Sequence, residues 1–348
     1  LGVSSMRVNM GNIENKGIEL TINATPIQLR DFSWQTTLTY TKNKNKVLKL
    51  SEGKSFVEDG KYLIEEGSPL GQWFGQKALG IYATDEANAY IKNSDGSFGD
   101  RLIPVYQRDP NNYNNYIYGS NGKPIFSHYE TKGGQKYTGD VGQMTTAGSV
   151  SKGGDIIWDD LDHDGVIGDS DRRILGNGMP TWYMGWTNYL NYKNFSLSFS
   201  FYGSFGNKIY NKQRRDLLQN SSSNMTPLAR DCYRLWKYQG QITEVYSSAK
   251  ATTGVNNARE LSSFFLEDGD YIRLTNARLA YRVDRNFTKR FHISDLQLYV
   301  YGNNLLTWTK YKGFDPSSIS NSNVLRPGID NGRYPTAREI GFGLNVNF

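Results

Sequence analysis

The sequence predicts an all-β fold, an antiparallel transmembrane β-barrel with long loops. Three observations predict it: alternating strand faces, the absence of long apolar runs, and connections that alternate between short and long. The clearest strand is 340–348, where apolar residues alternate with Gly or Asn, so that a pleated strand has two unlike faces. A soluble sandwich turns the apolar face towards a core, whereas a barrel turns it towards lipid. Because the strand ends at the aromatic Phe348, we favour the barrel.

The composition agrees with a barrel and argues against other classes. Aromatic residues make up 14% of the 348 residues, and no apolar run approaches the ~20 residues of a transmembrane helix. The net charge of +6 is scattered along the chain, whereas a nucleic-acid footprint needs basic residues on one face. Cys232 and three scattered histidines make a poor nucleophilic site. We therefore expect no nucleic-acid partner and no enzyme.

Six further stretches alternate in the same way. They are 17–24, 32–40, 182–192, 195–205, 271–283 and 296–303. The first two form a hairpin, and the next two form a second hairpin across Lys193-Asn194. A bulge at Thr275-Asn276 would restore the alternation of the strand at 271–283. Outside these strands we expect one short helix at 227–236.

The connections between these strands distinguish a barrel from a sandwich. Short turns alternate strictly with long polar segments along the chain. Outer-membrane barrels show the same alternation, with short turns on the periplasmic side and long loops on the extracellular side. We therefore expect 48–179 to be largely an extracellular excursion. It either forms one loop or contains an even number of further spanning strands, with short strand candidates at 70–82 and 155–158. A sandwich core is the alternative.

One acidic pattern within this segment predicts a metal site. Asp160, Asp162, Asp164, Gly165, Val166 and Asp171 occupy positions 1, 3, 5, 6, 7 and 12 of a D-x-D-x-D-G calcium loop. In such a loop the carboxylates and the carbonyl at position 7 converge on one cation. We expect Ca²⁺, or Mg²⁺ because Asp171 replaces the usual Glu. The alternative is a solvated acidic turn whose charge is offset by neighbours such as Arg172 and Arg173.

Six motifs occur in one order along the chain. They are NKGIE (15–19), EGSPLG (66–71), DHDG (162–165), PTWYMG (180–185), LEDGDYIRL (266–274) and GNNLLTWTKYKGFDP (302–316). Together they closely resemble the C-terminal half of the SusC/RagA family of TonB-linked outer-membrane proteins. The resemblance covers nearly the whole chain, and the last three motifs are specific to this family in combination.

The resemblance implies an active importer in the outer membrane. It implies a barrel of about 22 strands, an N-terminal plug, a segment that contacts the TonB complex, and a SusD-like surface lipoprotein that lids the barrel. The chain starts without a signal peptide, so we expect 1–348 to be the C-terminal part of the barrel domain, with the plug and N-terminal region absent.

The substrate implied by the resemblance is an oligosaccharide or, as the alternative, a peptide. The segment 111–118 contains Tyr113, Tyr116 and Tyr118 among asparagines, a composition that suits stacking on sugars, although a solvated loop is the better explanation. No substrate-binding residue is otherwise identified. The rival from another class is a surface adhesin or structural β-protein without transport.

Overall fold

The computed structural model describes residues 11–51, 53–218, 231, 233–247, 257, 261–317 and 323–348. Half of the helix expected at 227–236 lies outside these residues, as does Cys232. In the described half, residue 231 is helical, but 233–236 are not, because they form a turn followed by a bridge between Leu235 and Val245. The chain forms two compact units. Unit 1 comprises Leu1–Trp73, Gly176–Asn211 and Glu267–Phe348, and unit 2 comprises Phe74–Leu175 and Lys212–Leu266.

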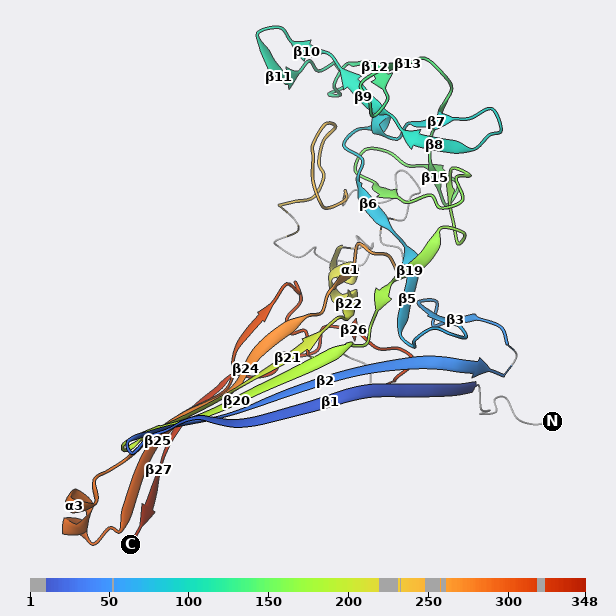
Figure 1. Ribbon diagram of the computed structural model, residues 1–348. Coiled ribbons are helices and arrows are strands. Elements are labelled where there is room, and N and C mark those ends of the chain that lie inside the picture. The colour runs from blue at the N-terminus through green and yellow to red at the C-terminus, as the bar shows by residue number, and fades with distance from the viewer. Residues whose placement is uncertain are drawn as a thin grey trace, which may run out of the picture. The chain divides into compact units, whose positions relative to one another are not determined.

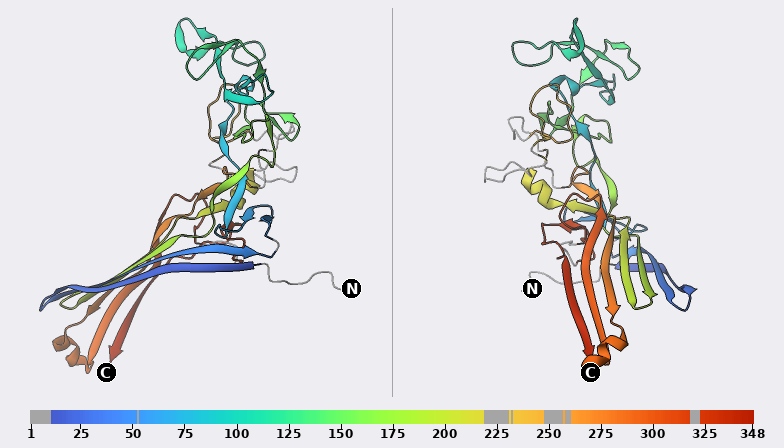
Figure 2. Two further views of the ribbon diagram at one scale, coloured as in Figure 1. Left: turned by 45° about the vertical axis from the view of Figure 1, so that its right-hand side comes forward. Right: turned by 90° about the vertical axis from the view of Figure 1, so that its left-hand side faces the viewer.

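Unit 1 is built on a seven-stranded sheet whose long strands lie side by side (Figures 1 and 2). The order is β1-β2-β20-β21-β24-β25-β27, and every neighbouring pair is antiparallel. The strands are β1 (Gly11–Gln28), β2 (Phe32–Leu50), β20 (Trp182–Tyr192), β21 (Phe195–Phe205), β24 (Tyr271–Arg282), β25 (Asp295–Thr309) and β27 (Glu339–Asn347). All seven expected strands are therefore present, in one sheet and in the expected order.

Three strands are longer than the alternation predicts. β1 and β2 continue pairing through Asn15↔Asn45 and Lys16↔Lys44, where polar residues occupy both faces and no apolar period marks a strand. β25 continues past Asn304, which adopts a left-handed conformation with φ of 52° and interrupts the alternation. The expected bulge is confirmed, because the register between β24 and β25 shifts between Leu274 and Asn276.

The two faces of the sheet differ as the alternation predicts. Ile340, Phe342 and Leu344 of β27 are exposed on the apolar face. On the polar face a Cβ added at Gly343 would lie 2.5 Å from the Tyr299 hydroxyl, and one at Gly341 would lie 2.6 Å from the Tyr301 ring. The glycines of the final strand thus make room for tyrosines of its neighbour β25.

Polar groups on the apolar face are covered by indoles. The Trp34 Nε1–H donates to Asn188 Oδ1 at 3.0 Å, and the Trp186 Nε1–H donates to Thr36 Oγ1 at 2.9 Å. Asn188 is fully buried beneath these side chains. The indole of Trp34 satisfies only the Oδ1 atom of Asn188, because no described residue forms a hydrogen bond with the buried Nδ2 atom.

The connections alternate between short and long. Segments 29–31 and 193–194 are tight, and 283–294 holds the short helices α3 (Arg285–Thr288) and η2 (Lys289–Phe291). On the other side, 51–181, 206–270 and 310–338 are long. β2 pairs directly with β20, and no described strand between them joins the seven-stranded sheet. The described part of 48–179 therefore adds no further strand to this sheet, and its extracellular position stays a prediction.

Short elements complete unit 1. Three lie at its boundaries with unit 2: β5 (Gln72–Gln76), β19 (Arg172–Asn177) and β23 (Leu266–Asp268). The others are β3 (Phe56–Glu58), β4 (Tyr62–Ile64), β22 (Lys208–Asn211) and β26 (Ile329–Asp330). Val47, Leu50, Ile64 and Leu70 form a small buried cluster beside the end of β2. The strand expected at 70–82 is two strands, β5 and a second strand at Ala78–Ile81.

Unit 2 consists of short strands and loops (Figure 1). Its elements are β6 (Ala78–Ile81), η1 (Asp85–Ala87), β7 (Tyr90–Lys92), β8 (Phe98–Arg101), β9 (Ile103–Tyr106), β10 (Arg108–Asp109), β11 (Asn112–Tyr116), β12 (Phe126–Glu130), β13 (Lys136–Tyr137), β14 (Val141–Gly142), β15 (Thr145–Thr146), β16 (Ser149–Val150), β17 (Ile156–Trp158), β18 (Val166–Ile167) and α1 (Lys212–Leu218). β17 confirms the strand expected at 155–158. Among the described residues, no helix has the length and apolarity needed to cross a membrane.

Candidate functional site

The acidic loop of unit 2 begins at the end of a buried strand. β17 is fully buried, and the chain turns from it through 160–165 into β18. Gly165 has φ of 79°, and a Cβ there would lie 2.5 Å from the Phe98 ring. Glycine at position 6 of the predicted loop is therefore required both by the left-handed backbone and by the packing of Phe98.

The structure brings three of the predicted ligands together. One carboxylate oxygen from each of Asp160, Asp162 and Asp164 lies within 4.8 Å of the others. Each side chain also accepts a backbone N–H of the loop. Asp160 Oδ2 accepts from Gly165 at 3.0 Å, Asp162 Oδ1 from Asp164 at 3.4 Å, and Asp164 Oδ1 from Val166 at 2.6 Å. These bonds fix the carboxylates against the backbone of the loop, where Asp160 is buried and Asp162 and Asp164 are exposed.

The other two predicted ligands have different surroundings. Asp171 is fully buried, and its two oxygens accept the N–H groups of Leu161 and Gly168, each at 2.7 Å. It thus joins the start of the loop to its end. Val166 lies in β18, which pairs with β15, and its N–H is the donor to Asp164. The cluster of carboxylates consists of the first three aspartates.

The neighbouring arginines do not neutralise this cluster. Arg173 pairs with Asp159 at 2.9 Å, and Arg172 lies 4.0 Å from Asp169 and donates to the Phe74 carbonyl. Within the described part of the chain, no Lys or Arg forms an ion pair with the three clustered aspartates. A solvated acidic turn would need nearby positive charge to offset its carboxylates. Arg172 and Arg173 do not provide that charge, because their partners are other residues.

Asp160 is the most buried member of the cluster. Asp160 is only 7% exposed. Among the described residues, none forms a hydrogen bond with its Oδ1 atom. Burial raises the pKa of this carboxyl, the Gly165 N–H opposes the rise, and the negative charge of Asp171 adds to it. A buried oxygen without a partner in a native fold calls for an explanation such as an ion.

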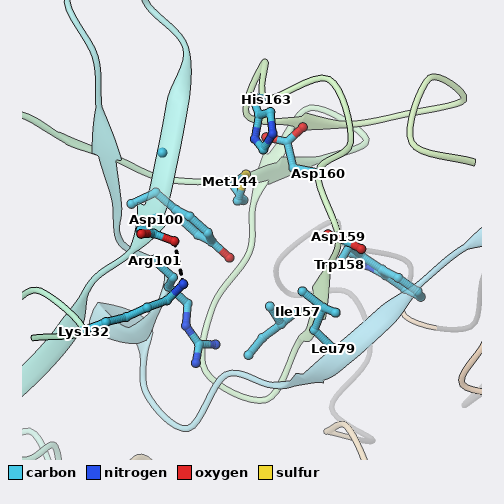
Figure 3. Close-up of a pocket in the computed structure, with 12 residues that line it drawn as sticks. Leu79, Asp100, Arg101, Lys132, Met144, Ile157, Trp158, Asp159, Asp160 and His163 are labelled. Atoms are coloured by element: carbon cyan, nitrogen blue, oxygen red, sulfur yellow. Dashed lines mark hydrogen bonds and ion pairs between the residues drawn. The ribbon is translucent and has the colours of Figure 1, made fainter.

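A cavity of about 350 Å³ adjoins the loop (Figure 3). Asp160 and His163 lie on one side of it, while Asp100 and Lys132 form an ion pair at 2.5 Å on another. Ile157 and Leu79 provide an apolar wall. The cavity is therefore mixed in character, with both charged and apolar lining residues.

One buried ion pair in unit 1 was not predicted from the sequence. Arg273 of β24 donates to Asp315 Oδ1 at 2.5 Å, to Thr307 Oγ1 at 2.9 Å and to Ser317 Oγ at 2.9 Å. Arg273 belongs to the motif LEDGDYIRL and Asp315 to the motif GNNLLTWTKYKGFDP. This ion pair thus joins the two motifs. The sequence signal that could have indicated the pair is one residue of opposite charge in each motif.

Comparison with known proteins identifies relatives along the whole chain. No family model matches. The chain is 35% identical over 351 residues to one TonB-dependent receptor of Formosa agariphila, covering 31% of that protein, and 29% identical over 364 residues to another, covering 30%. It is 25% identical to the TonB-dependent receptor SusC of Bacteroides thetaiotaomicron over 99% of the chain and 27% of SusC. The chain thus spans less than a third of the length of these relatives.

Solved structures show the same fold. The RagAB peptide transporter superposes with a TM-score of 0.64 at 17% identity, covering 98% of this chain and 30% of that one. The RagAB peptide importer in its closed-closed state superposes with a TM-score of 0.61 at 18% identity, with the same coverage. The resemblance predicted from the motifs is confirmed: the chain is similar over its whole length to TonB-dependent receptors, SusC among them, and it shares the fold of part of the solved RagAB transporter.

Proposed function

We propose that the protein containing this chain imports nutrients through the outer membrane, with energy supplied through TonB. The observation that carries the proposal is the seven-stranded sheet, which has an exposed apolar face and a polar face, within a family of TonB-dependent receptors. An apolar outer face matches lipid, and a polar inner face matches a wet channel. In this proposal the TonB complex, outer-membrane lipid and a SusD-like surface lipoprotein are the partners.

The long connections supply the extracellular side in this proposal. By connectivity, 51–181, 206–270 and 310–338 all join the same ends of the strands, and the shorter connections join the opposite ends. Polar loops of this length cannot lie in lipid. They are the surfaces on which a lipoprotein lid and the substrate would be recognised.

We propose an oligosaccharide as the substrate, with a peptide as the second candidate. Supporting the first, Tyr113 and Tyr118 are exposed beside asparagines. Tyr116 is less available to a sugar, because the Arg108 guanidinium lies 3.9 Å from the centre of its ring. Flat aromatic faces next to amide groups suit sugars, which have both apolar faces and hydroxyls. Supporting the second, the solved structures of similar fold are a peptide transporter and a peptide importer.

Uptake by living cells tests this proposal. A strain lacking the full-length protein, complemented with it or with an empty vector, is offered labelled oligosaccharides and labelled peptides. We expect accumulation of one class only in the complemented strain, and its loss when the proton gradient is collapsed. Equal uptake of every substrate by both strains would favour the adhesin or structural protein instead.

Accessibility on intact cells tests the orientation. An epitope tag inserted next to Asn112 in unit 2 should be reached from outside, whereas one at Lys193-Asn194, in the tight turn between β20 and β21, should be protected until the outer membrane is broken. The two insertions are matched because both lie in polar segments outside the seven-stranded sheet. The opposite result would invert the topology and remove the basis for the lid contact.

A further inference from the structure

The three clustered aspartates of unit 2 concentrate negative charge on a short loop. Asp160, Asp162 and Asp164 place one oxygen each within 4.8 Å of the others, and no described Lys or Arg pairs with them. Like charges so close together repel one another unless a cation lies between them. An exposed acidic cluster alone does not define a site, however, so the argument depends on Asp160.

Asp160 provides an independent sign of a ligand. It is only 7% exposed, and its Oδ1 has no hydrogen-bond partner among the described residues. Its Oδ2 accepts the Gly165 N–H, and one oxygen of the same carboxylate lies within 4.8 Å of an oxygen of Asp162 and of Asp164. A buried, unpartnered carboxylate oxygen is costly, because desolvation is not compensated. A cation at this position would compensate it.

The type of donor indicates the type of cation. All three side chains offer carboxylate oxygens, which are hard ligands that suit Ca²⁺ or Mg²⁺ rather than the softer transition metals. Ca²⁺ accepts about 6–8 oxygens in flexible geometry, whereas Mg²⁺ demands an octahedron and retains water. A loop whose carboxylates are already spread along alternate residues fits the larger and more tolerant ion.

The loop is also joined to two other strands of unit 2. The His163 carbonyl accepts the Phe98 N–H of β8 at 2.8 Å, and the Gly165 carbonyl accepts the Thr145 N–H of β15 at 2.9 Å. His163 lies between Asp162 and Asp164, and Gly165 lies between Asp164 and β18. Fixing the loop would therefore fix the positions of β8 and β15 as well.

We propose that unit 2 binds one Ca²⁺ through Asp160, Asp162 and Asp164, and that the ion holds the loop against β8 and β15. The Val166 carbonyl and water complete the shell, while Asp171 joins the two ends of the loop through Leu161 and Gly168. The inference goes beyond transport, since a Ca²⁺-stabilised unit 2 would be present whether or not the protein imports a substrate.

Calorimetric titration of Ca²⁺ into the chelator-treated full-length protein in detergent tests the site. We expect one binding event that Asp162→Asn and Asp164→Asn each weaken by roughly tenfold or more, because each removes a charged oxygen from the shell. Asparagine keeps a side-chain oxygen that can accept the same loop N–H, so these variants should still fold. Asp169→Asn is the matched control, since the Asp169 side chain is 96% exposed and lies outside the cluster.

Hydrogen–deuterium exchange on the same samples tests the structural consequence. Ca²⁺ should slow exchange at Phe98, Thr145 and Gly165 in the wild type and in Asp169→Asn, but not in Asp162→Asn. Mg²⁺ at equal concentration should have a much smaller effect. The proposal is overturned by a Ca²⁺ titration that is the same in all variants, by equal loss in the control, or by protection that Mg²⁺ reproduces in full.

Discussion

The two units place the same kinds of side chain in opposite positions. On the sheet of unit 1 the large apolar residues are outermost, and Phe342 is 90% exposed. Unit 2 has such residues in a core as well, and Trp158 is 2% exposed. Tyr82, Tyr90, Met144 and Ile157 form a buried cluster there, with the two tyrosine hydroxyls 2.9 Å apart. We attribute the difference to the medium, because in the proposed outer-membrane barrel lipid replaces a core as the apolar partner of the sheet.

The units also satisfy their backbone groups in different ways. The strands of unit 1 pair over long registers, such as that from Gly11↔Leu50 to Gln28↔Ser33, so backbone bonds alone define the sheet. The strands of unit 2 are too short for this. Buried side chains such as Asn88 and Asp171 bind backbone groups in their place. We therefore expect single polar substitutions to matter more in unit 2 than on the sheet.

The buried ion pair of unit 1 is the largest expected exception to this rule, because a polar substitution there should strongly destabilise unit 1. The side chains of Arg273 and Asp315 are 8% and 5% exposed, so Asp315→Asn would leave a buried guanidinium without its counter-charge. Losing one partner of such a pair costs about 3–5 kcal/mol. We expect much faster hydrogen exchange at 311–317 in the full-length protein. Asp295→Asn is the control, because its partner Arg282 is 65% exposed and exposed pairs contribute about 0–1 kcal/mol. Equal effects of the two variants would contradict this.

The same pair should respond to acid. Burial disfavours the ionised Asp315 carboxylate, but the N–H groups of Ser317 and Thr336, the Ser317 hydroxyl and Arg273 outweigh it and hold the pKa well below its usual range. A depressed pKa stabilises the folded state above the unfolded pKa of ~3.9. That stability is lost as the pH falls through the lower folded pKa. Protection of 311–317 should therefore fade below about pH 4 in the wild type, and Asp315→Asn should lack this dependence.

The next effect tests the orientation of the sheet. Phe342→Arg places a charge on the apolar face of β27 and should cost ~2–4 kcal/mol if the position is near the middle of the membrane. Asn345→Arg, on the polar face of the same strand, should cost much less, because Arg there meets water. The measurement is folding into lipid vesicles as a function of urea. A larger penalty at Asn345 than at Phe342 would reverse the two faces.

The sheet could be predicted because the alternation of apolar and polar residues is visible within each strand's own sequence. Alternation identified every strand, and the bulge at Thr275-Asn276 was visible as an error in the period. The ends of strands were less predictable where apolar alternation stops but pairing continues, as at Lys44 in β2. Backbone pairing with a neighbour is a tertiary property that a single stretch of sequence does not reveal.

The sites were predicted only in part for the same reason. The spacing of Asp160, Asp162 and Asp164 is local, and the structure brings these three together. The role of Asp171 depends on the folded positions of Leu161 and Gly168. The contact between Arg273 and Asp315 joins residues far apart in the sequence, so neither motif alone indicates its partner.

The smallest expected effect tests how unit 2 is held together. Asn88 is fully buried, its amide donates to the carbonyls of Met144 and Ser151 at 2.9 and 2.8 Å, and its Oδ1 accepts the Met144 N–H at 2.9 Å. Asn88→Ala would leave these backbone groups buried without partners, at about 1–3 kcal/mol. Hydrogen exchange should therefore accelerate at 144–151.

The control for this prediction is Asn93→Ala. Asn93 is exposed, and its amide makes a 3.0 Å bond to the Ser97 hydroxyl, so its loss should change stability by less than about 0.5 kcal/mol. In neither variant should exchange in β20 change, because the backbone bonds of that strand to β2 and β21 do not involve these asparagines. If Asn88→Ala accelerated exchange in β20 as strongly as at 144–151, the two units would unfold together, and the contrast between a sheet held by its backbone and a unit held by its side chains would fail.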